Sequence, residues 1–370
     1  MCTGNFLIPT SRASEMAEAF IQDLCERVRQ AADRKTALCI RSGGTKDFYG
    51  GTPSGEVLDV SKYSGIVAYE PKELVLTVKS GTPLAEIERV LDAERQMLAF
   101  EPPRFGAAST IGGTVAAGFS GPRRPYAGAV RDFVLGARIV NGKGEDLSFG
   151  GRVIKNVAGY DVSRLMAGAL GTLGVLTEIS FKVLPRPATE LTLSFPMDEA
   201  TATRQANEWA GQPLPLSGSA WTAGRLLVRL SGAASAVSAA RAKIGGDEAT
   251  DLPGFWDALR DQRLEFFGNP RALWRLSVPQ TAAPIPTAQG QLIEWGGGQR
   301  WVGGDLDARE IREVAARAGG HATLFRHGDK SVGAFHPLQP ALMKIHRRLK
   351  DAFDPAGILN PGRMYDFKGH

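Results

Sequence analysis

Residues 38–47 read LCIRSGGTKD, and this stretch decides which fold the sequence favours. Its first three residues form the short apolar run of a buried strand, which passes directly into a loop at 41–47. Small residues in that loop free several backbone N–H groups to converge on an anion, and Thr45 adds a hydroxyl and Lys46 a charge. The loop therefore favours a pyrophosphate site, while an ordinary turn at the end of a strand is the alternative.

Two further glycine-rich segments follow, at residues 109–113 and 168–174. The first, Ser-Thr-Ile-Gly-Gly, has two hydroxyls and two glycines that let a flat or phosphorylated ligand approach the backbone. A tightly packed turn is the alternative there. The second, Gly-Ala-Leu-Gly-Thr-Leu-Gly, is a weaker signal because such strings are common. The sequence has no Walker A or Rossmann fingerprint, so it supports neither an NTPase nor an NAD-binding fold.

The composition is that of a globular protein. The 370 residues are 43% hydrophobic and 22% charged, which excludes a disordered or fibrous chain. Glycine is enriched, with 44 residues, or about 12% against about 7% on average. The net charge of +5 comes from 44 Lys and Arg against 39 Asp and Glu. Because these cations are not clustered, we expect no nucleic-acid partner and instead attraction to anionic small molecules or an acidic partner.

Signals for membrane insertion, export and metal binding are missing from the sequence. No run approaches the roughly 18 apolar residues of a membrane helix, and residues 1–12 lack the charged and apolar regions of a signal peptide. The three cysteines form no Cys-x-x-Cys pair, so we expect no metal site and no iron–sulfur cluster. A cytoplasmic location is the resulting expectation.

Hydrophobic periodicity predicts an α+β chain with mixed connections rather than strict alternation of strands and helices. Ser14 is the predicted cap of the first helix. Helices are predicted at 14–28, 82–91, 237–244, 255–264, 307–318 and 338–353, and strands at 38–40, 57–60, 66–69, 74–79, 133–140, 226–230, 273–278 and 292–295. The segment 102–128, rich in Gly, Ala and Pro, is predicted to be a long functional loop. Asn141-Gly142 is a hairpin signal.

Taken in order, the glycine-rich loops resemble flavoproteins with the vanillyl-alcohol-oxidase or p-cresol-methylhydroxylase (PCMH) type of FAD-binding domain. The closer resemblance is to the FAD-binding E subunit of bacterial glycolate oxidase (glycolate dehydrogenase). It covers about residues 31–365 and is carried by residues 41–50, 98–103, 121–132, 155–161, 171–178 and 353–363.

The resemblance implies three parts of the chain. Residues 1–187 would form a two-lobed PCMH-type FAD-binding domain, and residues 188–326 an α+β cap over the flavin ring. Residues 327–370 would be a C-terminal segment that returns to the FAD domain. Composition also changes at Ala188, which agrees with a second α+β domain from there.

The resemblance also implies which residues bind FAD. They are Ser42, Gly43, Gly44, Thr45, Lys46 and Asp47 at the pyrophosphate, then Pro102, Ser109, Thr110, Gly112, Gly113, Ala116 and Gly118 along the cofactor channel, and Gly174 and Ile179 against the flavin or adenine. Members with a covalently attached flavin often carry His where this chain has Thr45. We therefore expect non-covalent FAD.

Candidate catalytic residues are Arg326 and His327. The catalytic sister subunit of the resembled enzyme carries a His-x-His pair and a His-Gly-Asp-Gly-Asn-like string that bind metal and the hydroxy acid. Only His327-Gly328-Asp329 remains of these here. Arg326 would clamp a carboxylate and His327 would act as a general base; a strand-edge charge and a solvated or packing histidine are the alternatives.

The implied function is oxidation of 2-hydroxy acids, glycolate to glyoxylate, by hydride transfer to FAD. One alternative is a non-catalytic electron-relay or scaffold subunit, and another is an FAD reductase using NAD(P)H. The implied partners are a second, catalytic FAD-binding subunit and an iron–sulfur subunit, with possible attachment to the inner face of the cell membrane through them. We expect Arg123 and Arg124 to lie in a solvated loop or a subunit contact, and a substrate clamp is the alternative.

Overall fold

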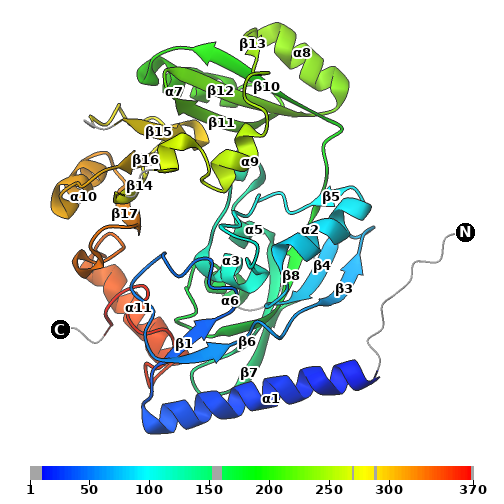
Figure 1. Ribbon diagram of the computed structural model, residues 1–370, viewed down its shortest axis with the longest axis vertical. Helices are drawn as coiled ribbons and strands as arrows, with labels where there is room; N and C mark the ends of the chain where they lie inside the picture. Colours follow the sequence, from blue (N-terminus) through cyan, green and yellow to red (C-terminus); the bar gives the residue numbers. More distant parts are fainter. Residues whose placement is uncertain (1–10, 152–160, 269–270, 287–289, 368–370) are drawn as a thin grey trace, which may run out of the picture.

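The computed structural model describes residues 11–151, 161–268, 271–286 and 290–367. Within these residues two main sheets carry the fold, one of five strands and one of eight. Figure 1 shows the eight-stranded sheet at the top and the five-stranded sheet below it, with the chain passing up from one and returning along the other side. Helices pack on both sheets, so the predicted α+β class is confirmed.

The chain begins its described part with a long amphipathic helix, α1 (Ser11–Arg34). Its buried stripe includes Ile21, Leu24 and Val28, which pack against Leu58 of β2. The helix already begins before Ser14, so Ser14 is not its cap. Strands β1 (Leu38–Arg41) and β2 (Glu56–Asp59) pair in parallel beside it.

The five-stranded sheet is antiparallel throughout, in the order β3-β4-β8-β6-β7. Its strands are β3 (Ile66–Glu70), β4 (Val75–Lys79), β6 (Val134–Val140), β7 (Asp146–Gly150) and β8 (Val175–Lys182). Helix α2 (Leu84–Ala93) buries Leu84, Ile87 and Leu91 in the same core as the fully buried Val78. Pro83 is the residue before this helix rather than its first residue. The short strands β5 (Gln96–Met97) and β9 (Leu184–Pro185) pair separately.

The segment 102–128 is not a continuous loop, which corrects the sequence prediction. It contains α3 (Ile111–Ala117) and α4 (Arg124–Ala127), and α5 (Val130–Phe133) follows. Thr110 caps α3 by accepting a hydrogen bond from the N–H of Gly113, and Gly118 ends it at φ 69°. The two glycines and the β-branched residues of this helix disfavour it locally, but burial of Ile111 and Val115 in the core overrides that preference.

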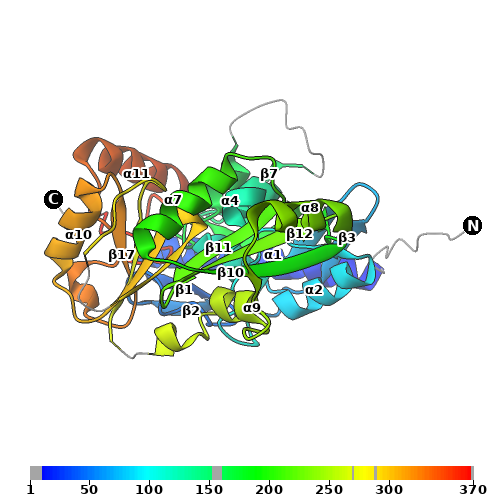
Figure 2. The same cartoon turned by 90° about the horizontal axis from the view of Figure 1, so that it is seen from above.

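The eight-stranded sheet is also antiparallel, in the order β13-β10-β12-β11-β15-β16-β14-β17. Its strands are β10 (Thr189–Pro196), β11 (Leu216–Thr222), β12 (Arg225–Gly232), β13 (Asp247–Glu248), β14 (Leu273–Ser277), β15 (Gln291–Glu294), β16 (Gln299–Gly303) and β17 (His321–Arg326). Figure 2 shows α7 (Glu199–Ala210) and α8 (Ala234–Ile244) lying over β10, β11 and β12. Helices α9 (Phe255–Arg260) and α10 (Ala308–Arg317) cover other parts of it.

The two faces of this sheet meet different partners, because successive side chains of a strand point to opposite sides. Trp274 and Leu276 pack in one cluster with Ile311 of α10. Leu273 belongs to a different cluster, which also contains Phe119 from the segment after α3. This second face is therefore turned toward the part of the chain that carries the glycine-rich loops.

The last part of the chain returns to the first. Helix α11 (Pro340–Phe353) ends at a buried ion pair in which Lys350 Nζ lies 2.5 Å from Asp354. Beyond it, Leu359 forms a parallel bridge with Leu38 of β1. Helix α6 (Val162–Met166) is capped by Asp161, the one residue of the 155–161 motif that falls inside the described residues. The predicted domain boundaries stay a prediction.

Within the described residues, none of the helices combines the length and the apolar character needed to cross a membrane.

Candidate functional site

One cavity lies where β1 runs into the glycine-rich loop, and we call it the main pocket. It encloses about 850 Å³. Four parts of the chain form most of its lining: the loop at 39–47, the segment around α3, the turn before β8 and the C-terminal stretch. The lining residues are Cys39, Ile40, Arg41, Ser42, Gly43, Gly44, Thr45, Lys46, Asp47, Pro53, Val60, Ser80, Thr110, Gly112, Gly113, Ala116, Ala117, Leu170, Gly171, Gly174, Leu176, Asn360 and Arg363.

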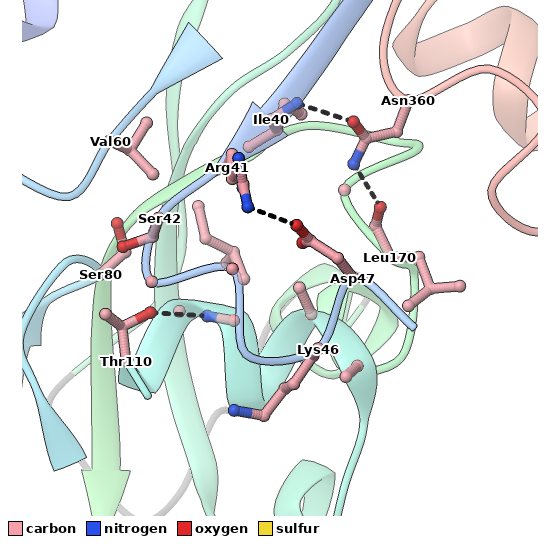
Figure 3. A pocket seen from close by; sticks show the side chains of 18 of the residues that line it. Ile40, Arg41, Ser42, Lys46, Asp47, Val60, Ser80, Thr110, Leu170 and Asn360 are labelled. Carbon is pink, nitrogen blue, oxygen red and sulfur yellow. Dashed lines mark hydrogen bonds and ion pairs between the residues drawn. The ribbon is translucent and has the colours of Figure 1, made fainter. Parts of the chain in front are cut away.

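The loop after β1 presents a row of backbone donors. The N–H groups of residues 42–46 donate to no acceptor in the described part of the chain. Gly44 has φ +67°, a conformation that side-chain-bearing residues rarely adopt, and an ion pair of 2.8 Å between Arg41 and Asp47 spans the loop (Figure 3). Consecutive free N–H groups in a concave loop bind anions, and phosphate groups above all.

Two buried hydroxyls also face the main pocket without a partner. The Oγ atoms of Ser42 and Ser80 are inaccessible to solvent and make no hydrogen bond among the described residues. Leaving such groups unsatisfied costs about 1–3 kcal/mol each. A polar ligand in the pocket would supply the missing partners, so the donor set fits the pyrophosphate and hydroxyl groups of FAD.

Helix α3 brings a second glycine pair to the pocket wall. Gly112 donates its N–H to the Ser80 carbonyl at 2.8 Å, and a side chain there would collide with Ser80. A Cβ on Gly113 would instead meet only the Thr110 hydroxyl, at 3.4 Å. Gly112 is thus required for packing, while Gly113 leaves open space beside the ligand.

The C-terminal segment closes the pocket on the far side. Asn360 Oδ1 accepts a hydrogen bond of 2.7 Å from the Ile40 N–H, and its Nδ2 donates one of 2.7 Å to the Leu170 carbonyl (Figure 3). Arg363 donates to the Asp47 carbonyl at 3.1 Å. Three distant segments are therefore held together around the loop.

Lys46 is almost fully buried and donates a hydrogen bond of 2.5 Å to Ser109 Oγ. Burial lowers the pKa of its ammonium group to about 8, while the charge of Asp261 opposes that shift. Lys46 also donates a hydrogen bond of 3.3 Å to Thr45 Oγ1, so the cation lies at the pocket wall with two hydroxyls as hydrogen-bond partners. Ser109 itself is outside the pocket lining.

The structure brings most of the predicted cofactor residues together. Lining the main pocket are Ser42, Gly43, Gly44, Thr45, Lys46, Asp47, Thr110, Gly112, Gly113, Ala116 and Gly174. Outside its lining are Pro102, Ser109, Gly118 and Ile179. Ile179 is fully buried in the apolar core of the five-stranded sheet, and Gly118 ends α3. A role for these residues in binding FAD stays a prediction.

Sequence reasoning missed several lining residues, notably Val60, Ser80, Leu170, Asn360 and Arg363. Ser80 follows β4 and carries no motif of its own. Asn360 and Arg363 lie in the C-terminal stretch that carries the family resemblance, and that stretch was the one signal that could have found them.

The two candidate catalytic residues lie apart from the main pocket. Arg326 lines a wide, open cavity with Thr45, Phe48 and Phe105, donates to Gln262, and stacks over the Phe48 ring at 4.9 Å. Burial lowers the pKa of its guanidinium. His327 is exposed, at φ 56°, and lines neither cavity. The pair therefore does not converge on one point, and its catalytic role stays a prediction.

Arg123 is buried, which corrects the expectation of a solvated loop for this residue, while a subunit contact of the pair stays a prediction. Arg123 is 8% exposed and forms ion pairs with Glu101, at 3.2 Å, and with Glu190. The guanidinium of Arg124 lies 4.4 Å over the Trp295 ring. These contacts join the segment after α3 to the eight-stranded sheet. The described residues contain no group of three or more His, Cys, Asp or Glu arranged to hold a metal ion.

Comparisons with known proteins agree with this geometry. The family described as "FAD binding domain" matches residues 19–150, and the family "FAD linked oxidases, C-terminal domain" matches residues 334–364. The chain is 49% identical to the glycolate oxidase subunit GlcE of Escherichia coli K12 over 346 residues, which cover 94% of this chain and 97% of the relative.

More distant relatives share only part of the chain. Glycolate oxidase subunit GlcD of Bacillus subtilis is 32% identical over 164 residues, 44% of this chain and 35% of the relative. A solved structure of p-cresol methylhydroxylase with substrate bound has a TM-score of 0.67 at 16% identity and covers 95% of this chain and 88% of its own. The PCMH-type fold predicted from the sequence is thereby confirmed.

Proposed function

This chain belongs to the family of the glycolate oxidase subunit GlcE, and from this premise we propose that it is the FAD-binding subunit of a complex that oxidises glycolate and related 2-hydroxy acids. It is an FAD-linked oxidoreductase by family. The observation that carries the proposal is the main pocket, in which free N–H groups at 42–46 and the unpartnered hydroxyls of Ser42 and Ser80 fit one phosphorylated ligand.

Each part of the pocket has a distinct task in this proposal. The loop at 42–46 and the Lys46 ammonium bind the pyrophosphate, and α3 supplies Thr110 and Gly113 along the cofactor. Asn360 links β1, which leads into the loop, to the turn at Leu170 through two hydrogen bonds. When bound, FAD supplies a two-electron acceptor for the oxidation of the 2-hydroxy acid.

The division of labour within the complex is also part of the proposal. The partners are a second FAD-binding subunit and an iron–sulfur subunit, which would receive the electrons. The proposed location is the cytoplasm, with attachment to the inner face of the cell membrane through those partners. The proposed parts of the chain are an FAD domain at 1–187, a cap at 188–326 and a returning segment at 327–370.

The alternative is an electron-relay subunit whose FAD does not meet glycolate. It is favoured by the exposed position of His327 and by the engagement of Arg326 with Gln262. With these features, Arg326 and His327 do not converge on one point where a substrate could bind.

Anaerobic reduction of the purified, FAD-loaded chain separates these functions. Bleaching of the flavin absorbance by glycolate supports a catalytic subunit, and bleaching only after the partner subunits are added supports a relay. Bleaching by NADPH without glycolate would instead support the reductase. A purified chain that holds no FAD at all would overturn the proposal itself.

A further inference from the structure

A second, smaller cavity lies where the eight-stranded sheet meets the segment after α3, and we call it the junction pocket. It encloses about 330 Å³. Its polar lining includes Arg275 on β14 and Glu294 at the end of β15, and its apolar lining includes Phe119 and Phe325. Neither Arg275 nor Glu294 belongs to a motif in the sequence.

Strand register places these side chains on one face of the sheet. Arg275 pairs with Trp301 across β14 and β16, and Glu294 pairs with Gln299 across β15 and β16. Residues 299 and 301 are two apart, so they point to the same side. This is the face turned toward the glycine-rich loops, since Trp301 packs in the same cluster as Phe119.

Arg275 is a half-buried cation whose charge has no counterion. One nitrogen, Nη2, donates to the Tyr49 hydroxyl at 2.9 Å, and the guanidinium lies over the Tyr49 and Phe325 rings at 5.5 and 5.4 Å. Among the described residues no carboxylate comes within 4.0 Å of it, and its other nitrogens have no acceptor. A guanidinium in this position is free to bind a carboxylate through two hydrogen bonds.

Glu294 is a buried carboxyl group in which one of the two oxygens accepts no hydrogen bond from the described residues. Its Oε1 accepts hydrogen bonds from Trp301 Nε1 at 2.6 Å and from Gln299 Nε2 at 3.1 Å. Its Oε2 has no donor in the described part of the chain. The two bonds fix the orientation of the group, so Oε2 is held in place as an acceptor at the pocket wall.

The walls between these two groups are aromatic. Phe105, Phe119, Trp301 and Phe325 line the junction pocket. Such walls exclude water and lower the local dielectric, which strengthens a charge-assisted hydrogen bond inside. The polar lining also includes Ser120, Arg260, Gln262 and Gln299, and Arg260 is already paired with Asp261 at 2.9 Å. Arg275 and Glu294 thus offer a cation without a carboxylate partner and an acceptor in one pocket, which suits a small ligand with a carboxylate and a hydroxyl on neighbouring carbons.

Shared wall residues relate the junction pocket to the cofactor side. Thr45 lines both the main pocket and the wide cavity that holds Arg326. Phe105 lines both that cavity and the junction pocket. A ligand at Arg275 would therefore be separated from the loop 42–46 by one intervening cavity, which shares a wall residue with each of the other two.

We propose that the junction pocket binds a small 2-hydroxy carboxylate, with Arg275 pairing with the carboxylate and Glu294 Oε2 accepting the hydrogen bond of the 2-hydroxyl. This inference rests on the proposed function for the class of substrate. It moves the substrate-binding role from Arg326 and His327 to two residues that no motif identifies. Arg326 and Arg275 each donate one hydrogen bond, to Gln262 and to Tyr49, but Arg326 lines the wide, open cavity, whereas Arg275 lines the junction pocket together with Glu294.

The test uses a probe that cannot be oxidised. 2-Hydroxyisobutyrate has the carboxylate and the 2-hydroxyl but no hydrogen on C2, and isobutyrate is its match without the hydroxyl. Both are titrated against the FAD-loaded chain at about pH 8.5, above the pKa of Glu294 of about 7, so that its carboxyl group is ionised. Trp fluorescence and the flavin spectrum are recorded. We expect the hydroxy acid to bind about tenfold or more tighter than isobutyrate, as a hydrogen bond to a charged acceptor allows.

Two variants assign the contacts. Arg275→Met should lower the affinity for both acids by about tenfold or more. Arg275→Lys should recover part of that lost affinity because it keeps the charge. In Glu294→Gln the affinities for the two acids should differ by less than about threefold, because the carboxylate that accepts from the 2-hydroxyl is lost. Trp301 keeps a hydrogen-bond partner in this variant. Arg317→Met, on the exposed side of α10, is the matched control and should change neither affinity.

The outcomes are separable from those of the proposed function. FAD content is measured on every sample, so a chain that lacks FAD overturns the FAD-binding function without deciding the junction pocket. Equal affinity of the wild-type chain for both acids would overturn the inference. So would wild-type affinities in the folded Arg275 and Glu294 variants.

Discussion

Arg229 of β12 lies 2.8 Å from Glu101, a residue of the segment that leads into α3. Glu101 also accepts hydrogen bonds from the N–H of Arg123, at 2.8 Å, and from Arg123 Nε. Arg229 is 5% exposed and its guanidinium lies 5.0 Å over the Trp256 ring. One carboxylate thus holds two buried cations and joins the eight-stranded sheet to the part of the chain that carries the glycine-rich loops.

Loss of this carboxylate should destabilise the protein strongly. Glu101→Gln leaves the buried Arg229 without its carboxylate partner and Arg123 with Glu190 alone, and breaking a buried pair in this way costs about 3–5 kcal/mol. Urea unfolding measures the difference. Glu313→Gln, which removes an exposed partner of Arg309, is the control and should cost less than about 1 kcal/mol. Equal stabilities of the two variants would contradict the assigned role of Glu101.

The pyrophosphate loop should not tolerate a branched residue at Gly44. With φ +67°, Gly44→Val forces a β-branched side chain into the left-handed region, beside the backbone donors that would bind phosphate. We expect FAD occupancy of the purified variant to fall at least about tenfold while far-UV circular dichroism stays unchanged. Gly224→Val is the matched control, because Gly224 has φ +75° with open space around it and lies in the turn between β11 and β12. Stoichiometric FAD in the Gly44 variant would show that this loop does not bind the cofactor.

FAD should be released by acid. Thr45 is not a residue that bonds covalently to flavin, and the one thiol in the lining, Cys39, has its pKa raised by burial, away from the reactive thiolate. Precipitation with trichloroacetic acid should therefore leave the yellow colour in the supernatant. Colour that stays in the pellet would contradict non-covalent binding.

His327 should matter little to turnover. Its side chain is exposed and lines neither the main pocket nor the junction pocket, so it has no enclosed substrate atom to act on. His327→Ala should lower the rate of the assembled complex by less than about tenfold, below the 10²–10⁴ expected for a positioned acid–base group. Turnover of glycolate by the isolated chain that His327→Ala abolishes would make this the catalytic subunit and His327 its base.

The ionisation of Glu294 should make stability fall as the pH rises. Burial raises the pKa of Glu294 from 4.5 to about 7, while the hydrogen bonds from Trp301 and Gln299 and the charge of Arg275 oppose that shift, and the charge of Glu101 adds to it. The folded state therefore holds a proton that the unfolded chain releases above pH 4.5. Stability from this group is full below that value and is lost as the pH rises to about 7.

Glu294→Gln is uncharged at every pH and removes this effect. Urea unfolding of both proteins at about pH 5 and about pH 7.5 measures it, and the wild-type chain should lose about 2–3 kcal/mol more across this interval than the variant. Parallel losses in the two proteins would mean that Glu294 titrates normally.

Local signals predicted the parts of the fold that local contacts form. The Asn141-Gly142 turn is one example, because Asn141 Oδ1 accepts hydrogen bonds from the N–H groups of Lys143 and Glu145, only two and four residues on. Helix α2 and the loop at 42–47 are others, since their residue types specify the conformation directly. The same holds for the strands β4 and β6, which are short apolar runs.

Features that depend on distant partners were not predictable in this way. The sequence around Arg123 is typical of a solvated loop. Arg123 is buried because Glu101 and Glu190, which are distant in the sequence, form ion pairs with it. Ser80 looks like any residue after a strand until α3 packs against it. Arg275 and Glu294 come together because β14, β15 and β16 pair in one register, and nothing near them in the sequence specifies that register.

Asn360 joins the first strand of the fold to the turn before β8, and this has a consequence for how the protein is made. Residue 40 leaves the ribosome long before residue 360, yet the N–H of Ile40 and the carbonyl of Leu170 both need that asparagine side chain. A nascent chain that has emerged only as far as α11 lacks one wall of the cofactor pocket. The complete cofactor pocket therefore exists only after residue 360 has joined the fold.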